Sequence, residues 1–198
     1  MSADAKRVQA QTKLDQIAQR IASCERCVEL CKNCSNPVPG EGDPQAKIMF
    51  VGEAPGAQED RTGRPFVGAS GKFLEEMLAG IGLDRSEVFI TSIVKYRPPN
   101  NRDPLPAEIS DCLPYLLEQI DAIRPKLLVF LGRHSLNVFF PELKISQAHG
   151  KPLELELEIG DKRFKQQCLA LYHPAAALYN GSLRAMLLED FNLIPTLL

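Results

Sequence analysis

The chain has 198 residues, of which 44% are hydrophobic, and a formal net charge of −2. This length and apolar content suffice for one full core, so we expect a single domain over residues 1–198. No apolar run reaches the length of a membrane span, and the polar N-terminal stretch has no signal-peptide core. We therefore expect a cytoplasmic protein that acts as a monomer away from membranes. The near-zero charge limits any nucleic-acid contact to a local basic patch.

The first predicted element is an amphipathic helix over residues 4–30, with its apolar stripe at Leu14, Ile17, Ala18 and Ile21. Four cysteines follow in the pattern C-x2-C-x3-C-x2-C, and a continued helix would place them all on one face. Cysteines at this spacing in an intracellular chain indicate reduced ligands rather than disulfides. The four are Cys24, Cys27, Cys31 and Cys34, whereas Cys112 and Cys168 stand alone.

A long loop joins the first predicted strand, Lys47 to Val51, to a helix that runs from an N-cap at Ser70 to Ile81. This loop is rich in glycine, proline and charged residues, and connections of such length are usually functional. Its carboxylates and Phe66 offer hydrogen-bond acceptors and a flat apolar face. The composition therefore favours a site that encloses a planar, polar ligand.

The remaining elements alternate between strands and helices. We predict a strand at Val88 to Val94, a proline-rich loop at Lys95 to Pro106, a helix at Ala107 to Ile123, a strand at Lys126 to Leu131, a short helix at Gly132 to Phe140, a hairpin of Leu153 to Ile159 and Arg163 to Leu171 turning at Gly160-Asp161, and a helix at Leu183 to Leu193. Such alternation predicts an α/β fold with three α/β/α layers and a mostly parallel central sheet.

Three motifs follow strands of this predicted sheet, at Gly52 to Gly68, at Lys95 to Asn101 and at His173. Ligands of parallel sheets bind beyond the carboxyl ends of the strands, so we expect the three motifs to form one site. His134, in a helix, and His149, in a loop, are expected to be structural.

These motifs resemble those of the family 4 uracil-DNA glycosylases, the iron–sulfur type. The likeness covers roughly residues 24 to 190 and is carried by GEAPG at Gly52 to Gly56, Glu59-Asp60, TGRPFVG at Thr62 to Gly68, ITSIVKYRPPNNRDPLP at Ile90 to Pro106, LVFLG at Leu128 to Gly132 and HPAA at His173 to Ala176. The resemblance implies a uracil-DNA glycosylase-like fold and an enzyme that flips uracil out of DNA and hydrolyses its N-glycosidic bond.

The resemblance also implies roles for individual residues. Catalytic roles fall to Glu53, Glu59 and Asn101, which would place the water and shape the pocket, and to His173, which would donate a hydrogen bond to uracil O2. Substrate contacts fall to Gly52, Ala54, Phe66 and Ser92, with Phe66 stacking on the flipped base. Phosphate contacts fall to Lys95, Arg97 and Arg102.

The residue types alone leave plainer interpretations open at several of these positions. Glu53 and Glu59 could cap loop amides, Phe66 could be core, and Asn101 could simply make a turn. A second functional hypothesis is an iron–sulfur DNA-binding or damage-sensing protein of the same fold with weak or altered excision. Ser92 stands where the family has an asparagine that reads uracil, which predicts weaker uracil excision and relaxed discrimination.

A [4Fe–4S] cluster is also implied by the resemblance, with Cys24, Cys27 and Cys112 matching three of the family ligands. The family's remaining cysteine is Tyr96 here, so Cys31 or Cys34 would have to complete the usual four thiolates. Zn²⁺ or a cluster held by the four N-terminal cysteines without Cys112, and a site without metal, are alternatives. Cys168, in an apolar strand, is expected to be core.

Overall fold

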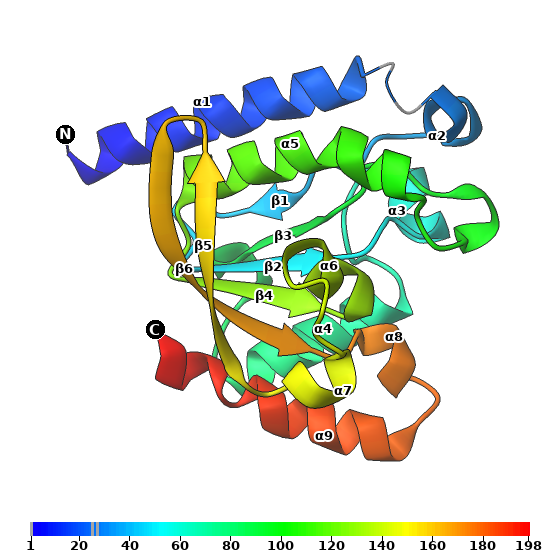
Figure 1. The fold of residues 1–198 in the computed structure, drawn as a ribbon, viewed down its shortest axis with the longest axis vertical. Helices are drawn as coiled ribbons and strands as arrows, with labels where there is room; N and C mark the ends of the chain where they lie inside the picture. The colour runs from blue at the N-terminus through cyan, green and yellow to red at the C-terminus, as the bar shows by residue number, and fades with distance from the viewer. Residues whose placement is uncertain (1, 25, 27) are drawn as a thin grey trace.

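The computed structural model describes residues 2–24, 26 and 28–198. Its centre is a six-stranded sheet with helices on both faces (Figure 1). The strand order is β1-β3-β2-β4-β6-β5, with bounds β1 Glu41–Gly42, β2 Ile48–Gly52, β3 Phe89–Ser92, β4 Leu127–Leu131, β5 Pro152–Ile159 and β6 Lys162–Leu171.

The four inner strands run parallel, because β2 pairs in parallel with β3 and β4, and β4 with β6. The edge strands β1 and β5 are antiparallel to their neighbours. This arrangement confirms the predicted three-layer α/β/α fold with a mostly parallel sheet. The predicted hairpin is confirmed as well, since Ile159 pairs with Lys162 across the Gly160-Asp161 turn.

Helices α1 and α5 cover one face of the sheet, and α4 and α9 cover the other (Figure 1). The helical bounds are α1 Ala3–Ala22, α2 Val28–Asn33, α3 Ala57–Thr62, α4 Ala69–Gly80, η1 Arg85–Glu87, η2 Pro99–Asn101, α5 Pro106–Ile123, α6 Arg133–Phe139, α7 Ile145–Ala148, α8 Pro174–Ala177, α9 Gly181–Phe191 and η3 Ile194–Leu197. In the described part of the chain, none of these helices has the length and hydrophobicity of a membrane span.

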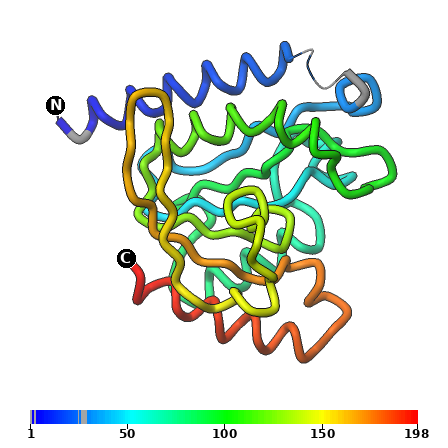
Figure 2. Tube along the Cα trace, viewed as in Figure 1, coloured from blue at the N-terminus to red at the C-terminus, as the bar shows by residue number. Residues whose placement is uncertain are grey.

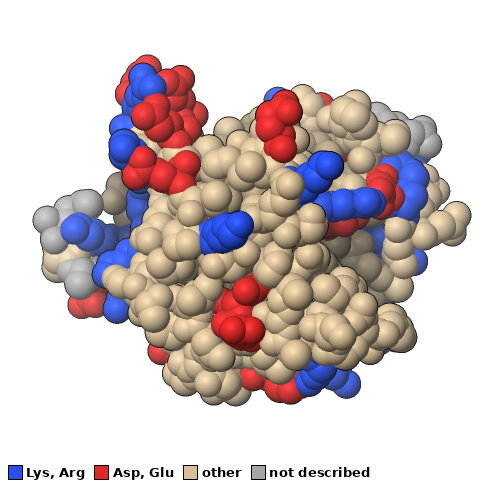
Figure 3. Space-filling model, turned by 60° about the horizontal axis from the view of Figure 1, so that its bottom comes forward, with Lys and Arg blue, Asp and Glu red and all other residues tan. Residues whose placement is uncertain are grey.

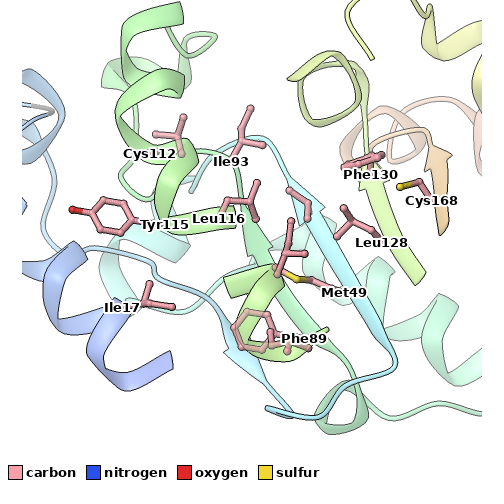
Figure 4. Close-up of a cluster of buried hydrophobic side chains, with 14 of the residues drawn as sticks. Ile17, Met49, Phe89, Ile93, Cys112, Tyr115, Leu116, Leu128, Phe130 and Cys168 are labelled. Atoms are coloured by element: carbon pink, nitrogen blue, oxygen red, sulfur yellow. The ribbon is translucent and has the colours of Figure 1, made fainter. Parts of the chain in front are cut away.

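The sheet separates two apolar cores, because neighbouring side chains along a strand point to opposite faces. In β2, Met49 packs in the cluster beneath α1 and α5, whereas Phe50 packs in the cluster with α4 and α9. Figure 4 shows the first cluster, with Cys112 on α5 and Cys168 on β6 at opposite sides of it. Cys168 is fully buried, as expected for a core residue.

The predicted N-terminal helix is too long by about two turns. Helix α1 ends at Ala22, where the Ser23 backbone amide bonds the Gln19 carbonyl and the Ser23 hydroxyl reaches the Arg20 carbonyl at 3.4 Å. A separate helix, α2, begins at Val28. The described cysteines therefore do not form a stripe along one continuous helix.

The long loop after β2 is partly helical, because α3 occupies Ala57–Thr62. Helix α4 begins at Ala69 with Gly68 as its N-cap, so the N-cap predicted at Ser70 is wrong. Gly68 has no side chain to cap the helix, and a carboxylate from α3 bonds the Gly68 amide instead. Strand β3 ends at Ser92 rather than at Val94.

The carboxyl ends of the parallel strands point away from the two chain termini (Figures 1 and 2). The loops that follow β2, β3, β4 and β6 meet at that edge of the sheet. The predicted motifs occupy these loops, so the topology brings them together.

Candidate active site

A cavity of about 360 Å³ lies at the carboxyl edge of the sheet. Its walls come from the loops after β2 and β3, the segment before α4, η2 and the start of α8. Eight residues predicted for the site line it, namely Glu53, Ala54, Glu59, Phe66, Ser92, Asn101, Arg102 and His173. Three segments distant in sequence therefore form one pocket.

Phe66 has an unusual backbone for a non-glycine residue, with φ at 51°. Its ring lies directly over Gly52, where an added Cβ would come within 2.6 Å of a ring carbon. A Cβ at Gly71 would meet the Phe66 carbonyl oxygen at 1.9 Å, so α4 packs against this backbone only because position 71 is glycine. Because Gly52 has no side chain, the Phe66 ring can lie against the Gly52 backbone and line the cavity.

His173 stands at the N-cap of α8, with its ring 5.6 Å from the ring of Phe66. Its Nδ1 accepts a hydrogen bond of 3.1 Å from the Ala175 amide, which leaves the proton of a neutral ring on Nε2. Burial lowers the pKa of His173 to about 4, with Glu59 opposing and His134 adding to the shift. The imidazole is therefore neutral at pH 7 and offers one N–H donor.

Glu59 braces the loop before α4. Its Oε1 accepts hydrogen bonds of 2.8 and 2.9 Å from the Val67 and Gly68 amides. A Cβ at Gly56 would lie 2.8 Å from Oε2, so the carboxylate also fits against a bare backbone. Glu59 therefore caps loop amides, which is one of the two interpretations that the sequence left open. It also lines the cavity.

Glu53 belongs to a charged cluster that the sequence did not predict. Its Oε2 lies 3.7 Å from His134 Nε2, and that nitrogen lies 3.4 Å from Asp103 Oδ2. Arg133 donates to both His134 and Asp103, at 2.9 and 2.8 Å. Burial raises the pKa of Glu53, His134 and Arg133 oppose that rise, and Asp103 adds to it.

His134 thus contacts the cavity carboxylate Glu53, although it does not itself line the cavity. The signal that could have found it is its place after β4, at the same edge of the sheet as the other motifs. The ligand atoms of Glu53, Asp103 and His134 lie within 4.8 Å of one another, a spacing that a cation could use. Since the Arg133 guanidinium already donates to two of the three, we interpret the cluster as a hydrogen-bonded ion group.

The loop with η2 presents Asn101 and Arg102 to the cavity. Asn101 has φ at 54°, a left-handed conformation that asparagine tolerates, and its Oδ1 accepts from Arg97 Nε at 2.8 Å. Arg102 forms two hydrogen bonds to Glu108 at 2.9 and 2.6 Å and keeps 35% of its side-chain surface exposed. Arg102 is thus fixed in the cavity wall, whereas Arg97 does not line the cavity and contacts the lining residue Asn101.

Lys95 does not lie at the rim, and its predicted role as a phosphate contact is wrong. Its side chain is fully buried, and Nζ donates to Thr91, to the Ser92 carbonyl and to Gln119 at 2.7–2.8 Å. Burial lowers the pKa of Lys95 to about 7. The segment that follows β3 turns this side chain inward, where it supports the backbone of Ser92.

Three of the described cysteines, Cys24, Cys31 and Cys112, lie together near Tyr96 and α5. Cys31 bonds the Cys24 carbonyl at 3.1 Å and the hydroxyl of Tyr96, and burial raises its pKa. Cys112 is buried on α5 and belongs to the same cluster of side chains. Cys34 lies beside Asp60, and burial raises its pKa to about 11. Cys27, predicted as a ligand, lies outside the described residues.

The face drawn in Figure 3 has no large patch of one charge, because basic and acidic side chains are interspersed on it. This pattern agrees with the net charge of −2. Any contact with a polyanion therefore depends on a few local side chains rather than on the summed charge of the face.

Comparisons with known proteins place this geometry in a family. A sequence model described as the Uracil DNA glycosylase superfamily matches residues 39–192. The chain is 49% identical over 193 residues to the type-4 uracil-DNA glycosylase of Sulfurisphaera tokodaii, covering 93% of this chain and 84% of that protein. It is 49% identical over 189 residues to the type-4 enzyme of Archaeoglobus fulgidus, with 93% and 92% covered. A type-5 uracil-DNA glycosylase of Pyrobaculum aerophilum is 32% identical over 191 residues, with 81% and 82% covered.

Proposed function

Because the chain belongs to the type-4 uracil-DNA glycosylases of the uracil DNA glycosylase superfamily, we propose that it excises uracil from DNA. The reaction hydrolyses the N-glycosidic bond and leaves an abasic site. The observation that carries the proposal is the neutral His173, which shares one cavity with the ring of Phe66. A planar base between them would meet an apolar face and a hydrogen-bond donor together.

The substrate base reaches this cavity only when it leaves the helical stack, since a paired base has its edge covered. In the proposal, the ring of Phe66 stacks on the extruded uracil, and the Ala54 amide and Ser92 hydroxyl face its polar edge. Gly52 keeps the floor open, because any side chain there would displace the Phe66 ring.

His173 stabilises the leaving base. Negative charge grows on uracil as the glycosidic bond breaks, and a donor fixed in advance costs no reorganisation at that moment. The hydrogen bond from Ala175 to Nδ1 directs the remaining ring proton outward from Nε2. Because burial lowers the pKa of His173 to about 4, the group serves as a neutral donor rather than as a general acid.

Glu53 is the better placed of the two carboxylates to hold the attacking water. One oxygen of Glu59 is already engaged by two loop amides, so Glu59 shapes the cavity. Glu53 faces the cavity beside His134, and the nearby Arg133 partly offsets the rise that burial causes in the pKa of Glu53. Asn101, oriented by Arg97, supplies a polar contact on the opposite loop.

Phosphate contacts fall to Arg97, which contacts Asn101, and to Arg102 in the cavity wall. Both lie on the η2 loop, and their bonds to Asn101 and Glu108 leave them partly exposed. Such local contacts suit a protein with a formal charge of −2, because positioning of one nucleotide needs few charges. We propose that the protein acts as a monomer in the cytoplasm and as a single domain, the last supported by one continuous six-stranded sheet.

We propose further that the cysteines hold a [4Fe–4S] cluster, with Cys24, Cys27 and Cys112 as ligands and Cys31 as the fourth. Cys31 contacts Tyr96, which occupies the position of the family cysteine, whereas Cys34 lies beside the acidic Asp60. A single Zn²⁺ ion, with Zn–S bonds of about 2.3 Å, would need its thiolates close together. No three of the described thiols lie within 4.8 Å of one another, which favours the larger cluster over zinc. When bound, the cluster would tie the N-terminal segment to α5.

The direct test is excision from oligonucleotides that contain a single uracil, in single strands and opposite guanine or adenine. A panel with hypoxanthine, xanthine and thymine opposite guanine measures lesion range. We expect uracil to be released as the free base with alkali-labile abasic product. Binding of uracil-containing DNA without base release would instead support the damage-sensing alternative.

A further inference from the structure

We propose that Arg85 is a positioning residue that fixes the ring of Phe66 in the cavity, and this inference rests on the proposed function. Arg85 lies in η1, nineteen residues beyond Phe66, and does not line the cavity. Its side chain is 15% exposed and points inward beneath the loop that precedes α4. The inference concerns the conformation of that loop rather than a contact with substrate.

The Arg85 guanidinium donates to two successive carbonyls of the loop. Nη1 bonds the Phe66 carbonyl at 2.8 Å, and Nη2 bonds the Pro65 carbonyl. The same group is held from behind by Glu41 of β1, whose Oε1 accepts from Nε at 2.9 Å and from Nη2 at 2.7 Å. Glu75 of α4 adds a longer contact of 3.2 Å. Arg85 thereby joins β1, η1, α4 and the Phe66 loop.

The carboxylate that anchors Arg85 remains ionised in the fold. Burial alone would raise the pKa of Glu41, but hydrogen bonds from Arg64 and Arg85 outweigh that effect and lower it. A charged anchor strengthens the bonds to the planar guanidinium, which also fixes the direction of the donors that reach Phe66.

Phe66 needs such support because its backbone is strained. A φ of 51° is uncommon for a residue with a large side chain, and such residues persist where the surroundings fix them. In this conformation the Phe66 carbonyl points toward Arg85 and lies close to Gly71. The Phe66 ring lies over Gly52. Relaxation to negative φ would move the ring away from Gly52 and from His173.

Loss of Arg85 should therefore weaken the capture of the flipped base and leave the bond-breaking groups in place. Among the described residues, Arg85 bonds Glu41, Glu75 and the Phe66 loop, whereas His173 is held by Ala175 and Glu53 lies in the His134 cluster. We expect KM to rise and kcat at saturation to change little, since Phe66 contacts the base before and during the reaction. A purely structural role would lower the active fraction and reduce kcat at constant KM.

The experiment compares Arg85→Met with Arg85→Lys and with the control Arg184→Met in steady-state excision of uracil from an oligonucleotide. Arg184 also pairs with an α4 carboxylate, Glu76 at 2.6 Å, but has no bond to the Phe66 loop. Arg85→Met should lower kcat/KM about tenfold through KM, as expected when a strained functional conformation relaxes. Arg85→Lys should recover only part of the loss, and Arg184→Met should keep both constants.

A double substitution tests whether Arg85 acts through the ring. In a Phe66→Ala background, Arg85→Met should lower kcat/KM by less than about twofold, because the ring that Arg85 positions is already absent. A parallel readout is the fluorescence of 2-aminopurine placed beside uracil, which should report less base extrusion in Arg85→Met. An equal loss in both backgrounds, or an unchanged KM in Arg85→Met, would overturn the inference. A wild-type protein without uracil excision would instead refute the proposed function.

Discussion

The cavity and the cysteine-bearing segment are held in place in different ways. Around the cavity, side chains bond backbone groups on separate elements, as Glu59 does to Gly68 and Arg85 to Phe66. In the N-terminal segment, the Cys31 and Cys34 thiols bond carbonyls of their own segment, at Cys24 and Cys31. These contacts indicate that the fold itself preorganises the cavity, whereas the proposed cluster would add a tie between the cysteine segment and α5 to the bonds that Ser35 and Asn36 make with Asp60.

The largest expected effect concerns the cavity. His173→Ala removes the one fixed donor at the leaving base, and we expect excision of uracil to fall about 10²–10³-fold. Single-turnover rates at saturating enzyme measure this loss without interference from product release. His149→Phe is the matched control, because His149 bonds Asp190 at 2.6 Å, outside the cavity.

Binding of uracil-containing DNA by His173→Ala should stay within a few-fold of the wild-type affinity, since the donor matters most in the transition state. An equal loss of binding and excision would contradict the assignment of His173 as a donor to the leaving base.

Motifs predicted the cavity because topology and residue type agreed there. His173 and the loop around Phe66 each follow a parallel strand, so the sheet alone brings them to one edge. The core position of Lys95 has no signal in its charge, because the whole segment that follows β3, from Ile93 to Tyr96, is buried and Thr91 and Gln119 supply the partners that a buried ammonium needs. His134 was missed because its site partners are distant in sequence, and the left-handed φ of Phe66 has no sequence signal beyond its neighbouring glycines.

The cysteine segment was predicted less well because spacing alone does not specify where a helix ends. The apolar stripe of α1 continues to Ile21, but the helix ends at Ala22 with Ser23 as its C-cap, an end that the spacing of apolar residues does not specify. Three of the four N-terminal cysteines are described, and only contacts in space separate Cys31, beside Tyr96, from Cys34, beside Asp60.

Substitution of these two cysteines would sharpen the contrast between cavity and segment. Cys31→Ser should lose about nine-tenths of the iron and of the visible absorbance that thiolate-to-iron charge transfer gives, because a cluster needs four thiolates. Cys34→Ser should keep both. Iron content and the visible spectrum of anaerobically purified protein are the measurements.

A second-site variant provides the decisive control for the cluster assignment. Because Cys31 contacts Tyr96, Cys31→Ser combined with Tyr96→Cys should regain the iron that the single variant loses. Full iron content in Cys31→Ser together with its loss in Cys34→Ser would reverse the assignment of the fourth ligand.

Acid should weaken the cavity through His173. Burial lowers the folded-state pKa of His173 to about 4 from an ordinary 6.5, so the unfolded chain takes up a proton first as pH falls. The stability due to the neutral ring is complete above pH 6.5 and is lost between pH 6.5 and about 4. Urea unfolding of wild type should lose about 2 kcal/mol more than His173→Gln between pH 7 and 4.5. Parallel pH profiles for the two proteins would contradict a buried neutral imidazole.

The smallest expected effect is a gain, at the residue where this chain departs from the family in the cavity itself. Ser92 is 3% exposed and lines the cavity at the end of β3, with its carbonyl held by Lys95 at 2.8 Å. Its hydroxyl is short and gives one donor, whereas an asparagine amide presents a donor and an acceptor to the edge of uracil. The net value of one such hydrogen bond is about 0.5–1.5 kcal/mol.

Ser92→Asn should therefore raise uracil excision up to about tenfold and increase the preference for uracil over other deaminated bases. Ratios of kcat/KM for uracil and hypoxanthine substrates measure both effects. Ser70→Asn adds the same atoms at another wall of the cavity and should bring no gain, which separates base reading from a simple change of volume. If Ser92→Asn lowers uracil excision, the longer side chain meets the ring over Gly52 rather than the base. In that case, the selectivity of the pocket would depend on the backbone conformation of Phe66, which Arg85 holds, rather than on Ser92 at the end of β3.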